Sequence, residues 1–466
     1  MALPQLAVRL APVGASHPRS ATPPSCLLGR RAHAAPPHVS RSLIPQLGKY
    51  ETVLALLRVC EPALRNVELS AELRVALTEG LARLVACLPA RDDCARQALA
   101  ALLGPPCTLL QATLAQAATA DAGWLRESAE NVATQVTLIG SSIRFCDRYT
   151  DNPERNPVLP VMQGGVWELL MQVAHGYRAH GAVVQAMCEL YSRMMATMNT
   201  LMRPLLPQLL QSLALSFTTT PVVGVLATLR DAIERYGGGQ HAAHDEELQH
   251  VLSGVMTALV ESVCAWLLAT KEPEAQPELL TAFWEMCHRC LVFQPGLLLS
   301  LPCTGQLFEA AIACVRHQEF QHTRAVLTFI CLFMCPTEAA NPYRETSVCC
   351  LQSSGKRLLR ECLSGLAAVS PDNLVDHQVE LMRVLVEACP GAVATWLKEL
   401  LAAPEGMTTG SVDPQGKTMQ AFAALVLQQP ALPQTEFQCV ASDFSRICRG
   451  KLGPEALDRY LMRAGP

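Results

Sequence analysis

The sequence contains few aromatic and few charged residues for its length. Phe, Trp and Tyr make up 5% of the 466 residues, and Asp, Glu, Lys and Arg make up 17%, whereas 50% are hydrophobic. Sustained alternation of polar and apolar residues is missing, and neither Asn-Gly nor Asp-Gly occurs anywhere in the chain. These absences argue against a fold built on β-hairpins. The abundant Leu and Ala favour helices instead.

The composition also argues against a disulfide framework and against a membrane span. The 20 Cys are dispersed through apolar segments of a large chain, which indicates a reduced, intracellular protein. The most apolar stretch, residues 251–270, contains Glu261 and is interpreted as a buried helix. Because a single hydrophobic core rarely exceeds about 250–300 residues, we expect several domains or one elongated repeat structure.

Charge is distributed unevenly along the chain. Residues 1–50 contain five Arg and one Lys without an acidic residue, whereas the remainder holds 31 Lys and Arg against 41 Asp and Glu, a balance of −10. Residues 1–48 are also rich in Pro and Ser, so we predict a disordered leader, with a targeting segment and a misplaced start of the gene as alternatives. The acidic remainder is suited to attract basic proteins rather than nucleic acid.

Residues 49–466 show helical periodicity. Apolar residues recur at helical spacing in segments of about 15 to 25 residues, which short breaks with Pro or Gly separate. Helix pairs advance at roughly 40 residues, which is typical of HEAT and armadillo repeats. We therefore predict an all-α protein in which residues 49–466 form one α-α superhelix, a HEAT/armadillo-like solenoid.

The segment 370–391 illustrates how such a helix is specified. Ser370 or Asp372 is expected to cap its start, and the pair Pro390 and Gly391 is expected to end it. One face is apolar and the opposite face is charged, so the helix needs packing partners. The residues expected to face the core are Leu374, Leu381, Met382, Leu385 and Cys389.

The hexapeptide EMCHRC, residues 285–290, contains a Cys-x-x-Cys pair of the kind found in zinc and redox sites. Cys287 and Cys290 nevertheless fall on the apolar face of their helix, from which the intervening His and Arg point away. His317 and His322 follow too far downstream for a zinc finger, and they flank a polar helix junction that we expect to face solvent. We therefore interpret both Cys as core residues, with structural zinc and redox chemistry as the alternatives.

Other segments do not support a catalytic or cofactor site. GSVDPQGKT, residues 410–418, resembles a phosphate-binding loop, but its glycine spacing is one residue too long and no strand precedes it. HAAHDEELQH, residues 241–250, is interpreted as the solvated start of a helix rather than a metal site. Neither catalysis nor a bound cofactor is predicted. We expect an interaction protein, because solenoids offer long concave surfaces to partners.

Three segments in the second half of the chain carry a family resemblance, and a fourth extends it with fainter similarity. They are PELLTAFWEMCHRCLVFQPGLLLSLP (277–302), ATWLKELLAAPEG (394–406), QCVASDFSRICRG (438–450) and the fainter NPVLPVMQGGVWELLMQVAHGY (156–177). In their order and spacing, these segments resemble the transportin-SR branch of the importin-β, or karyopherin-β, superfamily of nuclear transport receptors.

The resemblance implies a HEAT-repeat receptor that carries proteins through nuclear pores and shuttles between cytoplasm and nucleus. Its expected partners are protein cargo, basic or Arg/Ser-rich, together with nucleoporins and the GTPase Ran. Because the family binds Ran-GTP through N-terminal repeats, a chain that matches the C-terminal half is expected to bind Ran weakly or not at all. Neither nucleic acid nor membrane is an expected partner. A generic HEAT scaffold and a metal-dependent enzyme are the alternatives.

One helix departs from the family pattern. Transportin-SR receptors grip phosphorylated cargo with an arginine-rich helix, whereas the corresponding residues 182–205 contain only two Arg and are rich in Met, which is typical of core. Unphosphorylated basic cargo is therefore expected to bind at least as well as phosphorylated cargo. The candidate cargo-facing residues are Arg193, Arg203, Asp245, Glu246 and Glu247.

Overall fold

The chain forms two compact units, Met1–Thr228 and Leu229–Pro466, whose boundary falls within one helix. In this computed structural model, the leader at 1–48, Asp245 and most of the loop at 410–418 lie outside the described residues. The residues described are 49–88, 93–146, 155–238, 246–270, 276–335, 342–402, 417–428 and 431–464. Throughout these ranges the secondary structure is helical without strands, which confirms the all-α prediction.

The first unit is a series of helices. Its elements in chain order are α3 (Tyr50–Arg65), α4 (Ala71–Ala86), α5 (Cys94–Ala117), α6 (Ala122–Ile143), α7 (Val158–Val161), the π-helix η2 (Met162–Val166), α8 (Trp167–Gly176), α9 (Gly181–Met198), the 3-10 helix η3 (Asn199–Leu205), α10 (Leu206–Thr219) and the beginning of α11 (Val223–Tyr236).

The second unit continues from α11 with the same kind of helical pairs. Its further elements are α12 (Glu246–Ala269), α13 (Pro277–Phe293), α14 (Pro295–Leu299), α15 (Thr304–Cys314), α16 (Phe320–Met334), α17 (Arg344–Ser364), the π-helix η6 (Gly365–Val369), the 3-10 helix η7 (Asp372–Leu374), α18 (Val375–Ala388), α19 (Pro390–Ala402), α20 (Lys417–Val426), α21 (Gln434–Cys448), the 3-10 helix η8 (Pro454–Ala456) and α22 (Asp458–Ala464).

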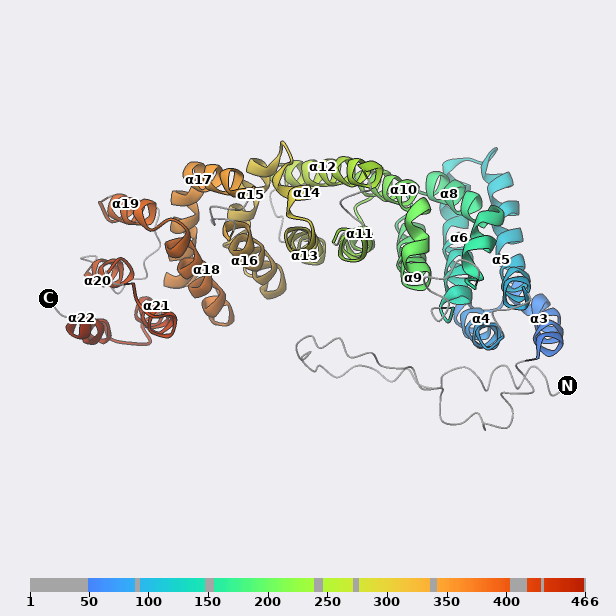
Figure 1. Cartoon of the computed structure of the whole chain (residues 1–466), viewed down its shortest axis with the longest axis horizontal. Helices are drawn as coiled ribbons and strands as arrows, with labels where there is room; N and C mark the ends of the chain where they lie inside the picture. The colour runs from blue at the N-terminus through green and yellow to red at the C-terminus, as the bar shows by residue number, and fades with distance from the viewer. Residues whose placement is uncertain are drawn as a thin grey trace. The chain divides into compact units, whose positions relative to one another are not determined.

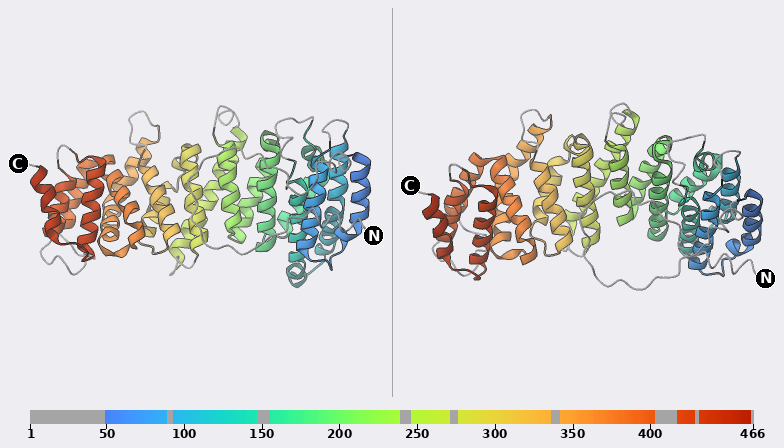
Figure 2. Two further views of the ribbon diagram at one scale, coloured as in Figure 1. Left: turned by 90° about the horizontal axis from the view of Figure 1, so that it is seen from below. Right: turned by 60° about the horizontal axis from the view of Figure 1, so that its bottom comes forward.

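Within each unit the helices form two layers. In the first unit, α3, α5, α8 and α10 pack in sequence on one side, and α4, α6 and α9 pack in sequence on the other. In the second unit, one layer contains α12, α15, α17 and α19, and the other contains α13, α16, α18 and α21 (Figure 1). Figure 2 shows the same side-by-side stacking from two further directions. This stacking is the arrangement of an α-solenoid, as the sequence predicted.

The core is mostly aliphatic, and its few aromatic residues lie where helices meet. Trp284 of α13 contacts Phe329 of α16 with ring centroids 5.2 Å apart, and Phe422 of α20 stacks on Phe444 of α21 at 4.1 Å. The Met-rich face of helix α9 is core, as predicted, and its Met side chains are at most 3% exposed. These residues are Met187, Met194, Met195 and Met198, together with Met202 of η3.

The start of α18 differs from the prediction. Neither Ser370 nor Asp372 caps the helix with its side chain, because a 3-10 turn precedes it and both residues have other partners. The Ser370 hydroxyl accepts a hydrogen bond from Gln378 at 3.1 Å, and the Asp372 carboxylate pairs with Arg449 at 3.0 Å. The predicted core face is confirmed for Leu374, Leu381, Met382 and Leu385, whereas Cys389 is half-buried.

Two helices are long and apolar enough to cross a membrane by length and composition. They span Cys94–Ala117 in the first unit and Glu246–Leu267 in the second. The first packs along α3, α4, α6 and α8, and the second packs along α14 and α15. Core helices of soluble proteins pass the same test, so it is weak support for a membrane span.

Candidate functional site

Helix α13 presents two chemically different faces. Cys287 and Cys290 are fully buried among the apolar residues of the second unit, and burial raises the pKa of Cys290 to about 12. The prediction that both are core residues is therefore confirmed. The residues between and before them, Glu285, His288 and Arg289, lie on the other face at helical spacing.

That polar face forms one wall of a groove of about 320 Å³, which we call the arginine groove. Its walls come from residues of three helices in the second unit, α11, α13 and α16. Polar residues lie at one-turn spacing along each helix, opposite the apolar stripe that packs into the core. The lining residues are Arg230, Glu285, His288, Arg289, Gln321, Arg324, Ala325 and Thr328.

Most of the positive charge in the arginine groove is locally paired. Arg230 binds Glu285 at 3.0 Å, and Arg289 approaches Glu234 at 3.9 Å. The Arg324 guanidinium, by contrast, makes no hydrogen bond or ion pair with the residues that the structure describes. Burial, and next the charge of Arg289, lower the pKa of His288. The groove therefore offers one unpaired guanidinium to an anionic group of a partner.

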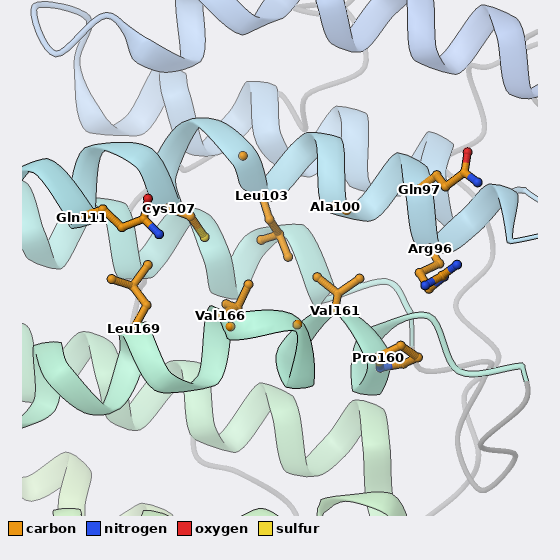
Figure 3. Close-up of a pocket in the computed structure, with 13 residues that line it drawn as sticks. Arg96, Gln97, Ala100, Leu103, Cys107, Gln111, Pro160, Val161, Val166 and Leu169 are labelled. Carbon is orange, nitrogen blue, oxygen red and sulfur yellow. The ribbon is translucent and has the colours of Figure 1, made fainter.

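A second groove lies in the first unit, between α5 and the segment that runs from α7 through η2 into α8. It has a volume of about 460 Å³ and is mostly apolar, so we call it the apolar groove. Figure 3 shows Leu103 facing Val161 and Val166 across it, with Arg96 and Gln97 at one end. The complete lining is Arg96, Gln97, Ala100, Leu103, Gly104, Cys107, Gln111, Pro160, Val161, Gly164, Gly165, Val166 and Leu169.

Residues without a side chain open the apolar groove. Gly104 lies on one wall, inside α5 and directly before Pro105. On the opposite wall, Gly165 adopts a positive φ of 107°, a conformation that favours glycine. A Cβ at either glycine would meet no atom within 4 Å, so the space beside them is open. Each wall of the groove therefore has open space where a glycine carries no side chain.

The structure places the predicted cargo-facing residues at separate positions. Arg193 is half-buried between α9 and α6, where its guanidinium donates to Ser141 at 3.3 Å and passes over Gly140. Arg203 lies partly exposed in η3. Glu246 and Glu247 are exposed in the first turn of α12.

The prediction for His317 and His322 is wrong. Both side chains are buried, at 8% and 1% exposure, and their rings approach each other at 2.8 Å between Nδ1 of His317 and Nε2 of His322. At the junction between α15 and α16, Glu319 caps α16 by accepting hydrogen bonds from the backbone of Gln321 and His322. The polar composition of VRHQEFQHTR, residues 315–324, therefore did not mean that its two His side chains face solvent.

Importins resemble this chain in sequence and in fold. No family model matches the chain. Importin-13 of Gallus gallus is 22% identical over 309 residues, covering 66% of this chain and 30% of its own length. Importin-13 of Homo sapiens is 22% identical over 306 residues with the same coverage. The chain is a relative of the importin-β (karyopherin-β) receptors.

The solved structures agree with this relationship at the level of the fold. A structure described as "Importin13 cytosolic state" superposes with a TM-score of 0.66 and 18% identity, over 87% of this chain and 44% of that one. The sequence match of this karyopherin-β relative spans 30% of the length of the curated relatives, and the matched part lies in their C-terminal half.

One of the segments that carry the family resemblance holds neighbouring helices of this chain together. Within QCVASDFSRICRG, the Ser445 hydroxyl donates to the Leu366 carbonyl at 2.6 Å, and Arg449 donates to the Ser370 carbonyl at 2.7 Å. Both bonds tie α21 to the irregular end of α17, where π-helical turns leave carbonyls without helical partners. These polar residues therefore stabilise the repeat stack.

Sequence reasoning missed the residues of the arginine groove that lie outside EMCHRC. Arg230 and Arg324 are 94 residues apart, and nothing in their local sequence marks them as neighbours of α13. The available signal was that polar residues recur on the exposed stripe of three helices, α11, α13 and α16. Sequence reasoning also did not consider Cys314, which lies three residues before His317 and is a possible metal ligand beside it.

Proposed function

We propose that the chain acts in nuclear transport as a non-catalytic receptor that carries protein cargo between cytoplasm and nucleus. The observation that carries this proposal is the match to Importin-13 across 66% of the chain, together with the shared helical-repeat fold. Residues 49–466 act in this proposal as a single solenoid. Cargo is basic or Arg/Ser-rich, as the acidic balance of the chain favours.

Charges on the surface of the second unit support contact with such cargo. Glu246 and Glu247 are exposed side by side at the start of α12 and attract basic segments. The arginine groove accepts single acidic groups of the same cargo through Arg324. Arg193 and Arg203 remain cargo-facing candidates on the first unit.

The apolar groove is the site where we expect a nucleoporin to bind. This groove has Leu103 and Val161 buried in its floor and Ala100 and Val166 accessible at its surface, which suits an apolar peptide segment. Ala100→Leu fills the groove from an exposed position of α5 and is expected to weaken binding of a nucleoporin fragment about tenfold. Ala101→Leu, one residue away and outside the lining, is the matched control.

The deciding experiment is transport in permeabilised cells. Fluorescently labelled full chain is added with Ran and an energy source, and nuclear accumulation of the chain and of an Arg/Ser-rich reporter is followed by microscopy. A receptor accumulates and carries the reporter with it, whereas a generic HEAT scaffold stays outside the nucleus. Exclusion of the chain under conditions in which human Importin-13 enters would refute the proposal.

Ran binding gives a second measurement. The part of the receptor that this chain matches differs from the N-terminal repeats through which the family holds Ran, so we expect weak or undetectable binding of Ran-GTP. Calorimetry with purified Ran-GTP checks this expectation. Submicromolar binding that survives removal of residues 1–48 would show that the chain contains a Ran site of its own.

A further inference from the structure

Three metal-ligating side chains converge at the junction between α15 and α16. Cys314 ends α15, His317 follows in the turn, and His322 lies in the first turn of α16. Their sulfur and ring-nitrogen ligand atoms all lie within 4.8 Å of one another. The spacing is Cys-x2-His-x4-His within nine residues, which is compatible with the local ligand spacing of zinc sites.

The cluster is buried, and its ligands are held in place. Cys314 and His322 are 1% exposed, and His317 is 8% exposed. The hydroxyl of Thr323 donates to the His317 carbonyl at 2.9 Å, while the Glu319 cap fixes the backbone of His322. Ligands on a rigid backbone lose little conformational freedom when an ion binds.

The two His rings approach each other through nitrogens that can bind a metal. Nδ1 of His317 and Nε2 of His322 face each other at 2.8 Å, whereas Nδ1 of His322 is buried without a hydrogen-bond partner among the described residues. With Nε2 of His322 on the ion, that Nδ1 carries the proton of the neutral ring.

We propose that Cys314, His317 and His322 form a zinc site that clips α15 to α16. Tetrahedral zinc holds two His nitrogens about 3.3 Å apart, so the 2.8 Å contact between the rings must open by about half an ångström. Cys314 binds as thiolate and releases its proton to solvent, and the fourth position is left to water. The ion stabilises the turn between two helical repeats, a role that is independent of transport.

The test uses the full chain, two variants of the proposed zinc ligands and one control variant that changes two other cysteines. Metal-free protein is dialysed against buffered Zn2+, and bound zinc per chain is measured by mass spectrometry. Cys314→Ala and His322→Gln are expected to raise the zinc Kd at least about tenfold. The matched control is Cys287→Ala with Cys290→Ala, which removes two buried thiols of the same unit and is expected to keep one zinc per chain.

Cobalt gives a readout that does not depend on stability. Co2+ bound to a thiolate produces a charge-transfer absorption, which is expected in the wild type and in the control pair and is lost in Cys314→Ala. If that variant does not fold, as judged by circular dichroism, His317→Gln replaces it. Wild-type protein without zinc uptake, or folded Cys314→Ala with unchanged uptake, overturns the proposal. Uptake of Cu+ without Zn2+ overturns the choice of metal.

Discussion

The apolar groove of the first unit and the arginine groove of the second lie between neighbouring helices of the same kind of fold, yet they are opened by different means. In the apolar groove, glycines remove side chains from both walls, so space arises where atoms are missing. In the arginine groove, long charged side chains line the walls and pair across helices. A helical repeat stack therefore sets where grooves occur, and the exposed residues set what each one binds.

The largest effect is expected for the core behind the arginine groove. Cys287→Ala with Cys290→Ala removes two fully buried thiols and is expected to lower the free energy of unfolding by about 1–3 kcal/mol, because both leave cavities. Urea denaturation measures the change. Cys349→Ala, at an exposed position, is the control and is expected to be neutral. Equal losses for the exposed and the buried thiols would contradict the core interpretation.

The glycine wall of the apolar groove is expected to give the next largest effect. Gly165→Ala places a Cβ on a backbone with φ of 107° and is expected to cost about 1–2 kcal/mol of stability. Gly254→Ala is the matched control, since Gly254 is exposed inside α12 with open space beside it. That change is expected to stabilise the chain by about 0.5–1 kcal/mol. A stabilising Gly165→Ala would show that the turn does not need glycine.

Phosphorylation of the cargo is expected to strengthen its binding to the arginine groove only weakly. Because Arg230 and Arg289 are paired with glutamates, a phosphate gains few new charge-assisted bonds. We expect an unphosphorylated Arg/Ser-rich peptide to bind at least as well as its phosphorylated form, with affinity falling as salt rises. Fluorescence anisotropy of paired peptides at two salt concentrations measures both effects.

Two double variants identify the residues responsible if the titration shows that the phosphorylated peptide binds more tightly. A tenfold preference for the phosphorylated peptide would contradict the expectation. Its loss in Arg193→Ala with Arg203→Ala would assign the preference to the first unit and to the family's own mechanism. Its loss in Arg289→Ala with Arg324→Ala would assign it to the arginine groove.

The smallest effect is the pH dependence contributed by His288 of the arginine groove. The pKa of His288 is lower in the folded chain than in the unfolded chain, so the folded state favours the neutral ring. Its contribution to stability is fully present above the unfolded pKa of about 6.5 and is lost as the pH falls toward the folded value. Thermal unfolding of wild type and His288→Gln between pH 5 and 7.5 checks this, and a parallel pH dependence of the two would contradict it.

Local sequence reasoning predicted residues whose role depends on one helix. The burial of Cys287 and Cys290 followed from their position on an apolar stripe, and the burial of the Met residues of α9 followed in the same way. The end of α18 near Pro390 also agreed, because proline and glycine act on the backbone directly. Its start did not agree, since Asp372 is bound to residues of α21 and of the turn that follows it.

The sequence by itself therefore determined the all-helical repeat architecture and the burial of the Met residues of α9 and of Cys287 and Cys290 in α13. These follow from periodicity and composition, which act within one helix or between adjacent ones. The resemblance to importin-β receptors rests instead on the order and spacing of a few segments. The tertiary structure decided which polar residues meet, because side chains from α11, α13 and α16 approach only when the repeats stack. It also decided the burial of His317 and His322. A turn made of polar residues was folded inward by the packing of the helices on either side of it.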